Sequence, residues 1–215
     1  FERAGLAIAR STLAQWVGQL GVSLQPLVDR LAELLRQGQV LHADETPIKL
    51  LAPGSGKTAT AYTWVIRSSD LETTARGVVY EFCNSRQGQH AATLLAGFQG
   101  SLVCDDYAGY KALFKQQKIN EAGCWAHARR KFFEAHKLNQ SEIAKEALHR
   151  IGQLYEVERQ GAALPLQERH LLRQTQSKPL LEEFKAWLLG KRQQLMNADG
   201  KRSANPPLTA STIRC

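Results

Sequence analysis

The stretch Val40-Leu41-His42-Ala43-Asp44-Glu45-Thr46-Pro47 decides the fold expected for this chain. Apolar residues enter the stretch, two adjacent carboxylates follow, and Pro47 is expected to stop it. An apolar run that ends in an acid is typical of a buried strand that delivers a carboxylate to its exposed end. The sequence therefore predicts a strand over 40–46 with Asp44 near its exposed end.

A second stretch, Ser101-Leu102-Val103-Cys104-Asp105-Asp106-Tyr107, repeats this pattern. Two strand ends that each offer an acid suit a divalent-metal site, because hard cations such as Mg2+ take oxygen ligands. Taken alone, each acid pair also fits the ordinary role of Asp and Glu in turns and caps. The pairing of the two stretches is what favours the metal-site interpretation.

Size and charge limit the class of protein. The chain has 215 residues, 43% of them hydrophobic, and a formal net charge of +8. It can therefore form a sizeable domain with an appendage, and the charge suits a polyanionic partner such as nucleic acid, although basic surfaces also serve solubility. No apolar run approaches a membrane span, and no secretory signal is visible. The cysteines, which form no CxxC pair, are expected to be mainly buried thiols of a cytoplasmic protein: Cys83, Cys104, Cys124 and Cys215.

Residues 1–38 are predicted to be helical. Residues 1–21 are expected to form a short helix, a turn and a second helix that stops at Gly21. This pattern is typical of a helix-turn-helix that contacts DNA, but simple packing of an amphipathic helix is the favoured interpretation, since few polar donors are present. A further stripe over 24–35 is interpreted as core, with Gly38 as the end of that helix.

From Val40 onward the pattern predicts strands and helices in alternation. The expected order is strands over 40–46, 62–68 and 77–83, a helix over 87–98, a strand over 101–105, a helix over 107–117, a strand over 119–125, and a helix from Ala126. Three sequential strands can form an antiparallel meander, and the later strands can add to it in parallel. Asp44 and Asp105 would then be neighbours near the middle of a mixed α/β sheet flanked by helices.

The segment Pro53-Gly54-Ser55-Gly56-Lys57-Thr58 superficially resembles a phosphate-binding loop. That motif needs a glycine five positions before Gly56, where Leu51 stands, and it opens a helix rather than a strand. The segment is therefore predicted to be a hairpin loop.

Three motifs in order give the chain its family resemblance. They are Leu41-His42-Ala43-Asp44-Glu45-Thr46-Pro47, Asp105-Asp106-Tyr107-Ala108-Gly109-Tyr110, and Gly123-Cys124-Trp125-Ala126-His127-Ala128-Arg129-Arg130-Lys131-Phe132. In these stretches the chain resembles the insertion-sequence-66 family of bacterial transposases. The resemblance implies a ribonuclease-H-like core with an acidic triad of two Asp and one Glu. It places the first Asp on Asp44 and the second on Asp105, with Asp106 ranked lower, and implies Mg2+ or Mn2+ as the cofactor.

The third motif supplies the expected DNA contacts. His127, Arg129, Arg130 and Lys131 are expected to lie near DNA phosphates, whose geometry suits the guanidinium fork. The alternative for these residues is a solvated helix face. Cys124 and His127 are too few to indicate a zinc site.

The resemblance also fixes the expected organisation. Residues 39–137 would be a partial catalytic core, 138–190 the helical insertion of the family, and 191–215 a disordered or out-of-frame tail. No Asn-Asn-x-x-Glu-Arg motif, which carries the family's catalytic Glu, follows the insertion, and the chain begins with Phe1. We therefore expect a chain cut short before its third acid; Glu156 and Glu158 lie in the insertion and are not expected to replace it.

The sequence thus predicts a DNA transposase of the Asp-Asp-Glu type that acts on transposon ends and target DNA, with little or no strand transfer by this chain. It would be a cytoplasmic, nucleoid-associated bacterial protein without a membrane partner, and it could assemble as a homo-oligomer. One alternative is a catalytically inactive DNA-binding or regulatory fragment; another is a pseudogene product that barely folds.

Overall fold

The chain folds into two compact units. The computed structural model describes residues 5, 7–52, 54–116 and 119–199. The first unit comprises Phe1–Leu102 and Ala108–Asn120, and the second comprises Val103–Tyr107 and Glu121–Cys215. The chain therefore crosses between the units next to the second acidic stretch and again within the fifth strand.

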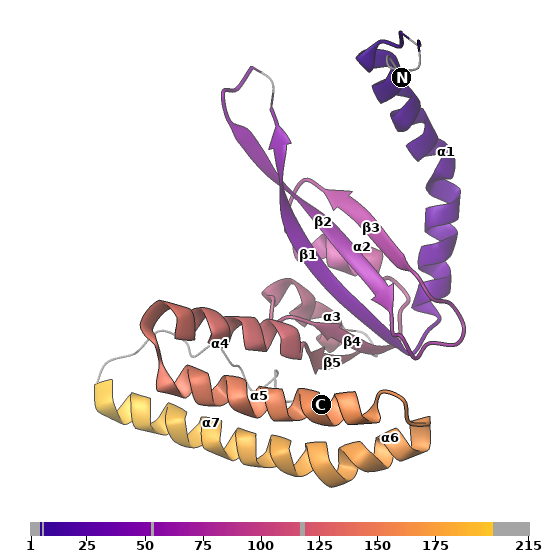
Figure 1. The fold of residues 1–215 in the computed structure, drawn as a ribbon. Coiled ribbons are helices and arrows are strands. Elements are labelled where there is room, and N and C mark those ends of the chain that lie inside the picture. Colours follow the sequence, from indigo (N-terminus) through magenta and orange to yellow (C-terminus); the bar gives the residue numbers. More distant parts are fainter. Residues whose placement is uncertain (1–4, 6, 53, 117–118, 200–215) are drawn as a thin grey trace. The chain divides into compact units, whose positions relative to one another are not determined.

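Five strands form one sheet in the order β3-β2-β1-β4-β5 (Figure 1). They are β1 (Val40–Leu51), β2 (Thr58–Ser68), β3 (Val78–Cys83), β4 (Gly100–Cys104) and β5 (Ile119–Gly123). β1 pairs with β2, and β2 with β3, in antiparallel fashion. This order confirms the prediction of a mixed α/β sheet flanked by helices, with the first and fourth strands as neighbours.

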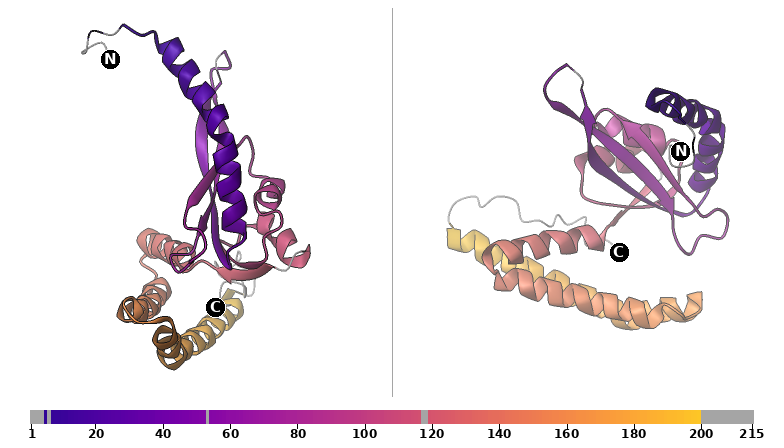
Figure 2. Two further views of the ribbon diagram at one scale, coloured as in Figure 1. Left: turned by 90° about the vertical axis from the view of Figure 1, so that its right-hand side faces the viewer. Right: turned by 45° about the horizontal axis from the view of Figure 1, so that its top comes forward.

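The first strand is longer than the sequence predicted. Pro47 does not stop it, because β1 runs to Leu51 and Pro47 lies opposite Tyr62 in β2. The two strands form a hairpin that extends beyond the other strands (Figure 2). Proline is tolerated where a strand has an open edge, since no neighbour then needs its missing N–H. The segment rejected as a phosphate loop connects these two strands, as predicted.

The core of the first unit lies under one face of this sheet. Its buried strand residues include Leu41, Ala43, Trp64 and Ile66. Short helices complete the unit: α2 (Gly88–Leu94), η2 (Ala108–Tyr110) and α3 (Lys111–Gln116). α2 contacts both β2 and η2.

The N-terminal helices predicted on either side of Gly21 are a single helix, α1 (Arg10–Arg36). The expected stop at Gly21 is therefore wrong, whereas the first helix of the possible helix-turn-helix falls largely outside the described residues, so that motif stays a prediction. Gly21 does not adopt the positive φ that ends a helix, and an interior glycine costs only about 1 kcal/mol. The stripe interpreted as core is buried only near the end of α1, at Ala32 and Leu35, whereas Leu24 and Leu27 are exposed.

The second unit is helical. It contains α4 (Trp125–Asn139), α5 (Glu142–Gly161), α6 (Leu166–Leu172), the π-helical turn η3 (Arg173–Ser177) and α7 (Lys178–Asp199). The hydroxyl of Ser141 caps α5 by accepting a hydrogen bond from the backbone N–H of Ala144. Such a bond satisfies one of the orphan donors at a helix start.

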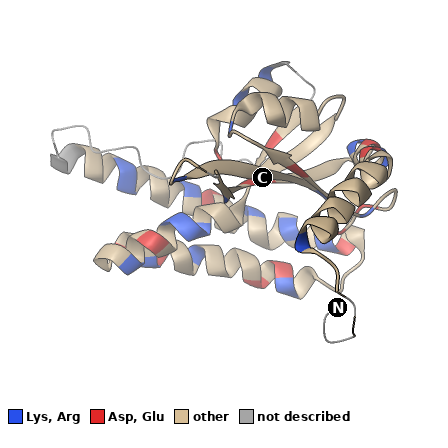
Figure 3. Cartoon of the chain, turned by 90° about the horizontal axis from the view of Figure 1, so that it is seen from above, with Lys and Arg blue, Asp and Glu red and all other residues tan. Residues whose placement is uncertain are grey.

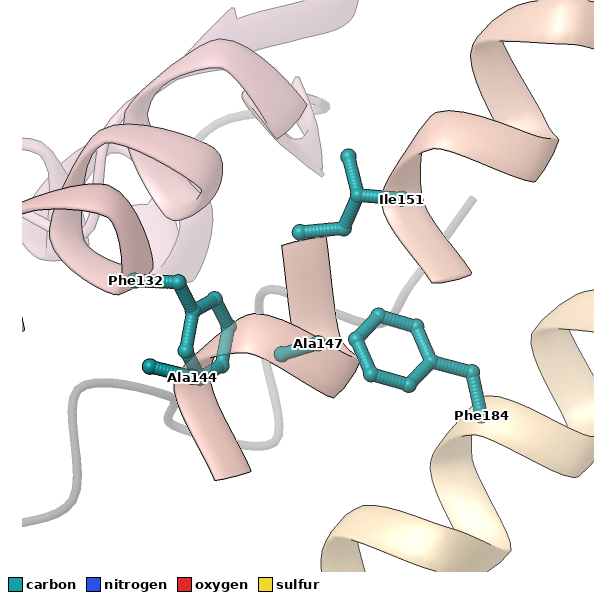
Figure 4. Close-up of a cluster of buried hydrophobic side chains, with 5 residues drawn as sticks. All are labelled: Phe132, Ala144, Ala147, Ile151 and Phe184. Atoms are coloured by element: carbon teal, nitrogen blue, oxygen red, sulfur yellow. The ribbon is translucent and has the colours of Figure 1, made fainter. Parts of the chain in front are cut away.

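Apolar side chains from three helices form the core of this unit. Phe132 of α4, Phe184 of α7, and Ala144, Ala147 and Ile151 of α5 point toward one another (Figure 4). The ring of Trp125 stacks against Phe184 with centroids 5.9 Å apart. The buried residues of α5 thus recur at helical spacing along one face of the helix.

The predicted disordered tail is partly wrong. Residues 191–199 belong to α7, and residues 200–215 lie outside the described residues. The polar side chains Lys191, Arg192 and Gln193 lack apolar periodicity, but they are good helix formers. Across the part of the chain that the structure describes, none of the helices combines the length and apolarity that a membrane crossing requires.

Candidate functional site

The side chains of β1 alternate between the two faces of the sheet, which separates the two adjacent acids. Leu41, Ala43 and Glu45 are buried, whereas His42 and Asp44 lie on the other face and are partly exposed. The carboxylate of Asp44 accepts a hydrogen bond from the backbone N–H of Glu45 at 2.9 Å. Of the two acids, only Asp44 is therefore accessible to a ligand from solvent.

Glu45 is the anchor of a buried polar cluster in the first unit. Its Oε1 accepts hydrogen bonds from Nε and Nη2 of Arg86 at 2.9 and 2.5 Å, and its Oε2 accepts one from the hydroxyl of Tyr110 at 2.8 Å. The side chain of Glu45 is 1% exposed and that of Arg86 43%. A buried carboxylate needs such partners, because an uncompensated charge in the interior is costly. Sequence reasoning missed this structural role of Glu45.

The face that carries Asp44 also carries His42, whose side chain is partly buried. His42 lies opposite Arg67 of β2 in the antiparallel register. Burial, and then the positive charge of Arg67, lower the pKa of His42 below its usual value. The surroundings of His42 therefore favour its uncharged form.

Asp105 directly follows β4 and makes a turn contact. Its Oδ1 accepts a hydrogen bond from the backbone N–H of Tyr107 at 2.9 Å, and both Asp105 and Asp106 are partly exposed. The N–H of Cys124 donates to the carbonyl of Cys104 at 2.9 Å, which ties the start of α4 to the end of β4. Asp105 therefore does have the ordinary role of an Asp in a turn, and its carboxylate remains partly exposed at the end of the strand.

The structure brings the strands of the two predicted catalytic acids together. The N–H of Ser101 in β4 donates to the carbonyl of Gln39, just before β1, at 2.9 Å. Asp44 belongs to the first unit and Asp105 to the second, so the distance between their carboxylates stays a prediction. Among the described residues no group of three or more His, Cys, Asp or Glu side chains has metal-binding geometry.

The predicted DNA contacts lie on α4. Arg129, Arg130 and Lys131 are exposed, whereas Ala128 and Phe132 of the same helix are buried. Among the residues that the structure describes, none of the three cations forms an ion pair. His127 is half-buried. Figure 3 shows Lys and Arg segments along several helices, interspersed with Asp and Glu.

The two acids of the insertion are engaged by arginines. Glu156 pairs with Arg159 within α5, and Glu158 accepts hydrogen bonds from Nε and Nη2 of Arg173 in η3 at 2.8 and 2.6 Å. The hydrogen bond from Arg173 lowers the pKa of Glu158 below its usual value. Both carboxylates are thus held in ion pairs on the helical unit.

The family model described as "Transposase IS66 family" matches residues 1–205. The chain therefore belongs to the IS66 family of transposases. It is 36% identical over 198 residues to a protein of Sinorhizobium fredii, "Uncharacterized protein y4qI". The matched stretch covers 87% of this chain and 37% of that protein. Protein y4hP of the same organism is 34% identical over 212 residues, or 91% of this chain and 38% of that protein. The chain thus spans less than two fifths of the length of these relatives.

Among solved structures, the chain is similar to a chain of the simian T-cell lymphotropic virus intasome in complex with PP2A regulatory subunit B56 gamma. The identity is 13%, the TM-score is 0.31, and the match covers 61% of this chain and 45% of that chain. A likeness of this degree supports no argument about function.

Proposed function

We propose that this chain carries two catalytic acids and part of the DNA-binding surface of a transposase. Such an enzyme cleaves DNA at transposon ends and joins the freed 3′ hydroxyl to target DNA. The observation that carries the proposal is the neighbouring position of β1 and β4 in the sheet, since Asp44 lies within β1 and Asp105 directly follows β4. Membership of the IS66 family supports the same activity.

Asp44 and Asp105 would hold Mg2+ or Mn2+, with Asp106 as a further ligand of lower rank. The donor chemistry fits, because partly exposed carboxylates offer the oxygen ligands that hard divalent cations prefer. A divalent ion bound there supplies Lewis acidity toward a phosphoryl oxygen. The backbone N–H groups of Glu45 and Tyr107 each hold one carboxylate oxygen and so restrain the orientation of the two aspartates.

The basic face of α4 would bind the DNA backbone. Arg129, Arg130 and Lys131 present exposed cations on one helix, and guanidinium forks match phosphate oxygens in geometry. His127, half-buried on the same helix, would lie at the edge of this surface. These contacts are independent of sequence and would position either a transposon end or target DNA.

The test measures duplex binding by fluorescence anisotropy, with and without Mg2+. The proposal expects affinity to fall as salt rises, and Mg2+ to tighten binding by the parent chain. The double variant Asp44→Asn, Asp105→Asn should bind DNA but lose the effect of Mg2+. The matched control is Asp29→Asn, because Asp29 is an exposed carboxylate on α1.

The outcomes separate catalysis from binding alone. An effect of Mg2+ that persists in the double variant would overturn the metal-ligand roles of Asp44 and Asp105. Binding that never depends on Mg2+, even in the parent, would favour a DNA-binding or regulatory protein instead. A chain that binds no duplex at low salt would overturn the proposal as a whole.

A further inference from the structure

The helical unit contains a cavity that the proposed function does not use. It has a volume of about 670 Å³ and is lined by α5, α6, η3, the start of α7 and the first residue of α4. This is the size range of small-molecule sites, about 300–1,000 Å³. Its walls include Trp125, Tyr155, Arg173, Gln174, Ser177 and Lys178. We refer to it as the η3 cavity.

Ser177 lines this cavity and carries a buried hydroxyl with no partner among the described residues. The residue is 9% exposed, and its Oγ has no hydrogen-bond partner in the described structure. Buried polar groups are nearly always satisfied, so an exception needs a ligand or an ordered water. Ser177 ends the π-helical turn, a rare irregularity that is frequent at functional sites.

The rest of the lining is mixed: aromatic and basic side chains lie beside Leu154, Leu181 and the carboxylate of Glu158. Trp125 and Tyr155 offer ring surfaces, and Gln174 adds an amide that can both donate and accept hydrogen bonds. Arg173 is held by its bidentate pair with Glu158, whereas Lys178 is exposed. A purely apolar ligand would leave the hydroxyl of Ser177 unsatisfied, so a flat polar ring with an anionic substituent matches this lining better.

One exposed cation of α4, Arg129, lies near a residue of the cavity wall. Trp125, in its wall, lies one helical turn before Arg129. Burial raises the pKa of the Tyr155 phenol above its usual value, and the nearby charge of Arg129 partly opposes this effect. Arg129 therefore lies within electrostatic reach of a cavity residue, on the helix predicted to contact DNA phosphates.

We propose that the η3 cavity binds one unstacked nucleotide of the DNA that lies on α4. This inference rests on the proposed function and adds a substrate feature to it. The base would stack on the aromatic wall, its edge would bond to Ser177 and Gln174, and its phosphate would face Lys178. Stacking on aromatic side chains holds single bases in many proteins irrespective of base identity.

The first experiment compares three duplexes that differ at one position. One is fully paired, one carries a single bulged thymidine, and one carries an abasic bulge with the same backbone. We expect the full chain to bind the thymidine bulge roughly fivefold or more tightly than the abasic bulge, the range for one stacked base. The second experiment detects binding of thymidine 5′-monophosphate alone by saturation-transfer NMR.

Two variants and two matched controls test the cavity itself. Tyr155→Leu removes aromatic wall, and Ser177→Ala removes the hydroxyl while relieving a buried unsatisfied group, so the second should fold at least as well as the parent. The controls are Gln153→Ala on α5 and Gln176→Ala in η3, because both residues are exposed and neither lines the cavity. The variants should lose the preference for the thymidine bulge, and the controls should keep it.

The outcomes distinguish this inference from the proposed function. Equal affinity for the two bulges, with no binding of the mononucleotide, would overturn the cavity site and leave DNA binding by α4 intact. Mononucleotide binding that Ser177→Ala weakens, without binding of any duplex, would support the nucleotide site and overturn DNA as the partner of α4.

Discussion

The hydroxyl of Tyr110 donates a hydrogen bond of 2.8 Å to Oε2 of Glu45 in the buried interior of the first unit. Tyr110 also contacts Trp64 edge to face, with ring centroids 6.0 Å apart, and Trp64 lies opposite Glu45 in β2. Glu45 is thus held by the sheet, by η2 and by Arg86. The carboxylate next to Asp44 is a structural anchor, and the strand that presents Asp44 is fixed from its buried face.

Tyr110→Phe should destabilise the chain by about 1–3 kcal/mol, because the change leaves a buried carboxylate oxygen with one donor fewer. The ring contact with Trp64 remains, so packing changes little. Urea denaturation of parent and variant at pH 7 measures this difference. An unchanged midpoint would show that the hydroxyl contributes nothing to the anchor.

Substitution of the two neighbouring acids should have opposite consequences. Glu45→Ala should lower the free energy of unfolding by about 2–3 kcal/mol, because it leaves Arg86 and Tyr110 without their shared acceptor. The loss is moderate because the side chain of Arg86 is partly exposed to water. Asp44→Ala should cost less than about 1 kcal/mol, as is usual at partly exposed sites. Thermal melting of the two variants side by side tests the assignment. Equal losses would contradict the separation of the acids onto two faces.

The pair between Glu158 and Arg173 should make stability depend on pH in acid. The pKa of Glu158 is lowered in the folded state, so its contribution is complete above the unfolded pKa of about 4.3 and is lost as pH falls through the folded pKa. Both side chains are more than a third exposed, so we expect only about 0.5 kcal/mol. Urea denaturation of the parent and of Glu158→Gln should differ at pH 7 and converge near pH 3. A difference that is constant across this range would exclude the ion pair as its cause.

The basic face of α4 should determine how steeply DNA affinity falls with salt. Each phosphate contact contributes about −0.9 to the slope of log affinity against log salt concentration. Arg129→Ala and Arg130→Ala should therefore each make the slope shallower by up to about 0.9. Arg30→Ala, whose guanidinium pairs with Glu33 on α1, is the matched control and should leave the slope unchanged. Identical slopes in the parent and the three variants would contradict the proposed contact between DNA and α4.

The strand order could be predicted because each strand is marked by β-branched and aromatic residues and each helix by apolar spacing. The anchor at Glu45 could be predicted only in part. The alternation of Leu41, Ala43 and Glu45 along β1 indicates that this acid faces the core, but Arg86 and Tyr110 lie 41 and 65 positions further along the chain. Partners so distant are known only once the fold has placed them.

Local sequence signals predict the wrong structure at three points. Gly21 is typical of a helix end but lies within α1, and Pro47 is typical of a strand end but lies within β1. The polar segment from Lys191 to Asp199 has no apolar stripe, yet it continues α7. Tertiary packing and intrinsic propensity decide such places. The η3 cavity could not be predicted either, because it depends on a π-helical turn that has no marker in the sequence.

The most direct test of the central claim is a Mn2+ titration of the parent chain, followed by calorimetry, beside Asp44→Asn, Asp105→Asn and the double variant. If both aspartates hold the same metal, each single change should weaken Mn2+ binding strongly and the double change should add little, because residues that share one partner act non-additively. Mn2+ affinity that is the same in the double variant as in the parent would contradict the account.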